Sequence, residues 1–154
     1  QRLRKHVDEQ LKISVLSVMM MALPVVLLVV MIVALWVAGE NTRLVVAYGF
    51  TVFFGWITAI ILGMTFKTLP FIVWNKVYHK KAGLGKTPNP KHLFSNRVFT
   101  GMAVSYLAGF VLFVTGILLS VVFVLQAGAL LLLLAAVLYN FNVIKIMLHK
   151  PAML

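Results

Sequence analysis

The chain contains no cysteine and only three acidic residues among its 154, whereas 14 residues are lysine or arginine. The absence of cysteine excludes disulfide bonds, thiolate metal sites and cysteine chemistry. Charged residues make up 11% of the sequence and hydrophobic residues 62%, against roughly 25% and 45–50% in soluble domains. A soluble fold is therefore excluded. The net charge of +11 must be interpreted from where the basic residues lie.

Aspartate, glutamate, lysine, arginine and histidine are missing from the interiors of four long apolar segments. A helix needs about 20 apolar residues to cross a hydrocarbon layer of ~30 Å. We therefore predict an all-α integral membrane bundle of four transmembrane helices, near residues 13–38, 44–66, 98–125 and 127–147. The last two belong to one uncharged stretch, Val98 to Ile144, which as a single helix would be roughly 70 Å long. A tight turn near Gln126 and Gly128 is predicted to divide it.

The basic residues predict the orientation of the bundle. All but Arg43 fall in three stretches, Arg2–Lys12, Lys67–Arg97 and Lys145–Lys150. Loops rich in lysine and arginine remain on the cytoplasmic side of the membrane. Both termini and the central loop (residues 67–97) are accordingly predicted to be cytoplasmic, in a multi-pass membrane protein.

The central loop combines apolar, aromatic and basic residues. Its first part, Pro70 to Lys81, is predicted to be an amphipathic interfacial segment between the second and third spans, because aromatic rings and lysine side chains suit the headgroup layer. Anionic lipid contact and docking against another transmembrane subunit are both open as its role, besides a plain topology signal. The candidate contact residues are Trp74, Lys76, Tyr78, Lys80, Lys81, Lys86, Lys91 and Arg97.

Small residues recur every four positions on the second and third spans. Such spacing lets two helix backbones approach closely, which is how helices associate inside a bilayer. The second and third spans are therefore predicted to pack together, although small residues are also common in membrane helices generally. The candidate packing residues are Gly55, Ala59 and Gly63 on one span and Gly101, Ser105 and Gly109 on the other.

Nucleotide, metal and catalytic sites have little support in this sequence. The run Gly83 to Thr87 looks like part of a phosphate-binding loop, but Lys80 occupies the position of the first glycine and Pro88 obstructs the helix that should follow. All four histidines lie in the basic segments and none in a span. We predict no catalytic, metal or cofactor-binding residue in this segment, and neither nucleotide nor nucleic acid as a partner; whether the whole protein is an enzyme stays open.

The stretch from Phe54 to Trp74 resembles a region of bacterial multi-span proteins related to subunit I of haem–copper (cytochrome c) oxidases, with the pattern GW…LGMxxKxLPFxVW. Gly85-Lys86-Thr87-Pro88 extends the similarity. The resemblance, and a first residue that is Gln1 and not methionine, imply a carboxy-terminal portion of a longer chain. The resemblance also implies a multi-pass protein of the bacterial inner (plasma) membrane. The family's haem ligands are histidines within spans, whereas the corresponding region here reads Val46 to Phe50. Any haem in the full-length protein would therefore be held elsewhere.

These observations predict a segment of an oxidase-like respiratory membrane protein that carries no ligand and contributes helix packing and contacts to subunits or lipids. Two alternatives stay open: a structural or accessory subunit of a larger membrane complex, and a small oligomeric transporter or lipid-binding protein. The predicted partners are anionic membrane lipids, together with other transmembrane subunits or the remainder of the chain.

Overall fold

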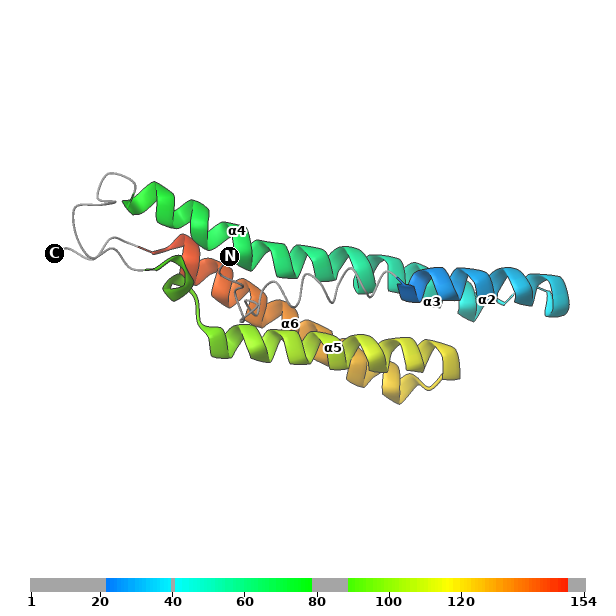
Figure 1. Ribbon diagram of the computed structural model, residues 1–154. Helices are drawn as coiled ribbons and strands as arrows, with labels where there is room; N and C mark the ends of the chain where they lie inside the picture. The colour runs from blue at the N-terminus through cyan, green and yellow to red at the C-terminus, as the bar shows by residue number, and fades with distance from the viewer. Residues whose placement is uncertain (1–21, 40, 79–88, 150–154) are drawn as a thin grey trace, which may run out of the picture.

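The computed structural model describes residues 22–39, 41–78 and 89–149, and this part of the chain is helical. α2 (Ala22–Ala38) is followed by α3 (Thr42–Phe50), a π-helical segment η1 (Thr51–Ile57) and α4 (Thr58–Tyr78). A 3-10 turn, η3 (Pro90–Leu93), precedes α5 (Asn96–Leu119) and α6 (Val122–Met147). α5 and α6 form an antiparallel hairpin, and the long helix made by α3, η1 and α4 runs beside it (Figure 1).

Three helices are long and apolar enough to cross a membrane: Thr42–Tyr78, Asn96–Leu119 and Val122–Met147. They agree with the second, third and fourth predicted spans, which confirms the all-helical, multi-pass character. Of the first predicted span, 13–38, the structure describes a 17-residue helix, Ala22–Ala38. Its apolar part, Pro24–Val37, is shorter than the other three. Residues 13–21 lie outside the described residues.

The second span continues far beyond residue 66, where the sequence predicted its end. Helical conformation runs without interruption from Thr42 to Tyr78, 37 residues, or about 55 Å. The predicted separate interfacial segment is wrong in this respect, because residues 67–78 are the last turns of α4. Pro70 lies inside the helix and is buried, and a proline there costs one backbone hydrogen bond. Leu69, Val73 and Trp74 around it pack against the hydrophobic core, and this burial offsets the cost.

The turn between the last two helices was also predicted wrongly. It lies at Ser120 and Val121, and Gln126 and Gly128 are inside α6. Ser120 adopts the left-handed conformation with φ 57°. The N–H of Val121 donates to the carbonyl of Gly116 at 3.2 Å, and that of Ser120 donates to the carbonyl of Ile117 at 3.3 Å. These two bonds close the end of α5 in the way that helix C-termini commonly close.

The hydrophobic core lies towards the end of the bundle where α4 ends and α5 begins. Phe66 of α4 packs against Phe94, Phe99 and Tyr139, with ring centroids between 5.1 and 5.6 Å apart. Phe66 and Phe99 are almost completely buried. The outward faces of α2 and α6 remain apolar and exposed, as expected of helix surfaces that lie against lipid.

Candidate functional site at the polar end of the bundle

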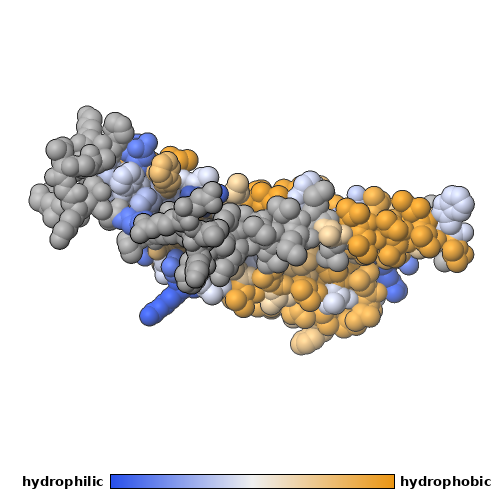
Figure 2. Space-filling view, viewed as in Figure 1, coloured by the Kyte–Doolittle hydropathy of each residue, from blue (hydrophilic) through white to orange (hydrophobic). Residues whose placement is uncertain are grey.

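Most of the cationic residues of the described chain lie towards one end of the bundle. At this end α4 and α6 end and α5 begins (Figure 1). In the space-filling view, hydrophilic residues collect at this end and a smaller number lie at the other end, while hydrophobic residues cover most of the coloured surface between them (Figure 2). We call this region the polar end. The exposed cationic residues here are Lys67 and Lys76 of α4, Arg97 of α5 and Lys145 of α6.

One buried side chain near the end of α6 joins this helix to the start of α5. Asn142 of α6 is completely buried. Its Oδ1 accepts the N–H of Ser95 at 3.1 Å, and its Nδ2 donates to the carbonyl of Ser95 at 3.2 Å. Ser95 is the residue before α5, so its N–H has no partner of its own within that helix. Asn142 therefore satisfies the entry of the chain into α5 and fixes it against α6.

A second polar contact joins α4 to the end of α6. The hydroxyl of Tyr78 lies 3.1 Å from Nε2 of His149, and Tyr78 is 5% exposed. The Trp74 ring lies one turn earlier on α4, 6.1 Å from the ring of Tyr78. The last turns of α4, with their aromatic residues, are thus held against the hairpin and do not project alone.

The predicted contact residues are only partly brought together at the polar end. Trp74 and Tyr78 face inward and contact neighbouring groups, whereas Lys76 and Arg97 are exposed. Lys91 is in η3, but its side chain lies outside the described residues. Lys80, Lys81 and Lys86, and the glycine-rich run from Gly83 to Thr87, are likewise outside them.

Ion pairing cannot neutralise these cations within the described chain, because the three acidic residues, Asp8, Glu9 and Glu40, all lie outside it. The polar end is therefore a surface of one sign. Phe71 and Ile72, each 59% exposed, lie between Lys67 and Lys76 on the outer face of α4. A surface of exposed cations and large apolar groups matches the boundary between acyl chains and headgroups.

Two of the predicted packing glycines, Gly101 and Gly109 of α5, face α6 within the hairpin and not the second span. A Cβ placed on Gly109 would lie 3.0 Å from the carbonyl oxygen of Gly128 and from the Leu132 N atom. The backbones of α5 and α6 thus touch at Gly109 and Gly128. A Cβ placed on Gly116 would lie 2.8 Å from the Cγ atom of Leu125 of α6. Gly101 is less tight, because its nearest neighbour, Leu138 Cδ1, is 3.7 Å away.

Gly55 of the second span faces an aromatic side chain of the third span and not a small residue. Gly55 lies against Phe110 of α5, whose Cζ would be 2.9 Å from an added Cβ. Ala59 and Gly63 are buried on the same helix, and Ser105 is half-buried on α5. Gly55 is in the π-helical segment, where Tyr106 of α5 donates its hydroxyl hydrogen to the carbonyl of Phe54. A π-helix shifts the backbone pairing by one residue, and Tyr106 provides a donor beside that shift.

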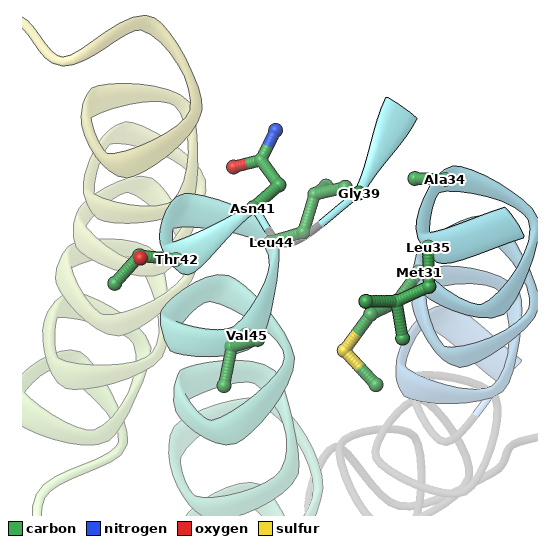
Figure 3. Close-up of a pocket in the computed structure, with 8 residues that line it drawn as sticks. All are labelled: Met31, Ala34, Leu35, Gly39, Asn41, Thr42, Leu44 and Val45. Atoms are coloured by element: carbon green, nitrogen blue, oxygen red, sulfur yellow. The ribbon is translucent and has the colours of Figure 1, made fainter. Parts of the chain in front are cut away.

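Two of the hollows in the described part of the chain lie beside α2 and α3 and along α5. One, of about 340 Å³, lies between α2 and α3 at the opposite end from the polar residues. Figure 3 shows Met31 and Leu35 of α2 and Val45 of α3 around it. Its eight described lining residues carry no charge, and Asn41 Oδ1 accepts the Arg43 N–H at 3.1 Å. The other is a shallow groove along α5, of about 580 Å³, which we call the α5 groove; its lining residues are Asn96, Arg97, Thr100, Gly101, Val104 and Ser105.

Metal-binding chemistry has no set of ligands in the described residues, which contain no cluster of three or more histidine, aspartate or glutamate side chains. Residues that sequence reasoning missed are Asn142 and Gly128. Asn142 could have been found as one of two amides, with Asn140, at the end of an apolar run; Gly128 was assigned to a turn.

Comparison with protein-family models, with curated proteins and with solved structures finds no match.

Proposed function

We propose that this chain is a structural membrane segment, which holds a basic and aromatic surface at the boundary of the bilayer and there contacts anionic lipids and neighbouring transmembrane subunits. The observation that carries the proposal is the polar end. Two side-chain hydrogen-bonded pairs, Asn142 with Ser95 and Tyr78 with His149, fix three helices together there, while cations around them remain exposed.

The boundary of the hydrocarbon is proposed to lie near Lys67 of α4. The interior of this helix before Lys67 carries no charge, and α6 becomes polar at the same level, where Thr65 lies 3.3 Å from the hydroxyl of Tyr139. Arg97 follows Ser95 at the start of α5. Lysine and arginine at this depth attract anionic headgroups, each by about 1 kcal/mol.

Lipid selectivity in reconstituted vesicles tests the proposal. Spin-labelled phosphatidylglycerol is expected to associate with the full chain more strongly than spin-labelled phosphatidylcholine. Neutralising Lys67, Lys76 and Lys145 together with glutamine should move this ratio towards one. Arg43→Gln at the opposite end is the matched control and should leave the ratio largely unchanged. Equal association of both lipids with the unmodified chain would refute lipid contact as the role of this surface.

The orientation is part of the same proposal: the polar end faces the cytoplasm. A reporter inserted between residues 82 and 92 is expected to be active in the cytoplasm, and activity outside the membrane would reverse the topology. Placement within an oxidase-like respiratory protein rests on the sequence resemblance alone. The absorption spectrum of the full-length protein tests it, since a Soret band is expected if the whole chain holds haem and its absence would remove this reading.

A further inference from the structure

The α5 groove has a cation at one end and a floor of small and apolar residues along the rest of its length. Arg97 is exposed at its mouth, while Gly101, Val104 and Ser105 continue it along the helix. Residues 97 and 105 are separated by about 12 Å along the helix axis. Val104 is 61% exposed, so the groove opens outward from the bundle.

We infer that the α5 groove holds one anionic phospholipid, with its phosphate beside Arg97 and an acyl chain along Gly101, Val104 and Ser105. This inference rests on the proposed function, because it requires Arg97 to lie at the boundary of the hydrocarbon. It goes further in naming a single resident lipid in place of a general attraction to headgroups.

Charge favours an anionic headgroup as the occupant of the mouth. An arginine beside a phosphate forms charge-assisted, frequently bidentate hydrogen bonds, and the described chain offers Arg97 no carboxylate. The neighbouring Thr100 hydroxyl already donates to the carbonyl of Asn96 at 3.0 Å. Arg97 is therefore the charged lining residue that distinguishes an anionic lipid from a neutral one.

Shape favours an acyl chain as the occupant of the floor. Gly101 and Ser105 lie one turn apart on one face of α5, and both line the groove with little side-chain volume. The Cβ of an added residue at Gly101 would meet only Leu138 Cδ1, at 3.7 Å, so this glycine is not required by close helix packing. The groove therefore remains open to a flexible hydrocarbon chain.

Photo-cross-linking identifies the occupant directly. A benzophenone amino acid replaces Val104 in the full chain, reconstituted in vesicles of equal parts phosphatidylglycerol and phosphatidylcholine, and the adducts are identified by mass. An adduct enriched in phosphatidylglycerol is expected. An adduct with another part of this chain or with a second copy would overturn the inference, as would equal labelling of both lipids.

A charge variant and a shape variant separate the two halves of the inference. Arg97→Gln is expected to reduce the phosphatidylglycerol adduct about fivefold, the factor expected for one cation near an anionic headgroup, whereas Arg43→Gln should not change it. In the chain without the photoreactive residue, Val104→Trp should reduce the amount of phospholipid that stays bound through purification in detergent. Val111→Trp, on the same helix face but outside the groove, is its control. Retention equal in both tryptophan variants would contradict a lipid in the groove.

These outcomes are distinct from those of the proposed function. Selectivity of the spin-labelled lipids depends on Lys67, Lys76 and Lys145 and reports on the whole polar end. A chain that shows this selectivity but gives no lipid adduct at Val104 would overturn the resident lipid alone. Excess inorganic phosphate, added as a probe, is expected to leave the yield of the lipid adduct unchanged. If phosphate abolished the adduct, the groove would be an anion site in place of a lipid site.

Discussion

Replacing Gly128 with alanine should weaken the α5–α6 hairpin, because the backbone of the partner helix occupies the space of the new methyl group. A Cβ on Gly128 would lie 2.8 Å from the Phe113 N atom, 3.0 Å from the Phe113 Cα and 3.1 Å from the carbonyl oxygen of Gly109. Ordinary contacts at such an atom are 3.4 to 4 Å. Backbone atoms cannot rotate away, so the helices must separate by roughly half an ångström, a gap that forfeits about a quarter of each contact's dispersion energy.

The expected loss of stability is about 1–3 kcal/mol, the usual cost of forcing an extra methyl group into a packed interface. Alanine also has a higher helix propensity than glycine by about 1 kcal/mol, which would partly hide the effect. Gly101→Ala is therefore the matched control, because it has the same propensity gain and its Cβ meets only Leu138 Cδ1, at 3.7 Å. The difference between the two variants isolates the clash.

Unfolding of the full chain in mixed micelles, titrated with SDS and followed by circular dichroism, measures this difference. We expect Gly128→Ala to unfold at a lower SDS fraction than Gly101→Ala, and Gly109→Ala to behave like Gly128→Ala. If Gly128→Ala were as stable as Gly101→Ala, the backbone contact would not contribute to the hairpin and the reasoning would fail.

Two further substitutions test the polar contacts. Asn142→Ala removes both side-chain hydrogen bonds to Ser95 and should lower the stability by about 1–3 kcal/mol, because it leaves a buried donor unpaired. The control in the same SDS titration is Asn140→Ala, since the Asn140 amide donates only within its own helix, to the carbonyl of Ala136. Equal losses of stability in the two variants would argue against a special role for Asn142. Tyr106→Phe removes the hydroxyl that donates to the Phe54 carbonyl and should lower the stability by about 1 kcal/mol. It should also raise the rate of amide hydrogen exchange in residues 51–57. An unchanged rate there would mean that Tyr106 does not stabilise the π-helical segment.

The apolar segments predicted three of the helices because their signal is strong and local. About 20 apolar residues without a charge leave few structures other than a helix inside a bilayer. The ends of the helices were predicted less well. Pro70 and the lysines after Phe66 suggested a break, yet Leu69, Val73 and Trp74 find partners in the core, a gain that depends on tertiary structure and has no local pattern.

The candidate site was predictable in kind but not in arrangement. Basic and aromatic residues between the second and third spans suggested a polar surface there, and the structure adds which of the described ones point outward. Tyr78 turns inward to His149, which lies 71 positions away in the sequence. A contact between such distant residues cannot be predicted from spacing, because it depends on the pairing of α4 with the end of α6.

The position of the hairpin turn shows which physical constraint was decisive. A turn centred near residue 127 would place Lys145 opposite Gly109, in the middle of the apolar layer, where an unpaired cation is expensive. The observed turn at Ser120 and Val121 instead brings Asn142 level with Ser95 and keeps Lys145 at the polar end. It costs a left-handed serine, about 1–2 kcal/mol, but frees Gly128 for the backbone contact with Gly109. In this hairpin the burial of charge and the approach of helix backbones decide the register, and the preference of glycine for turns does not.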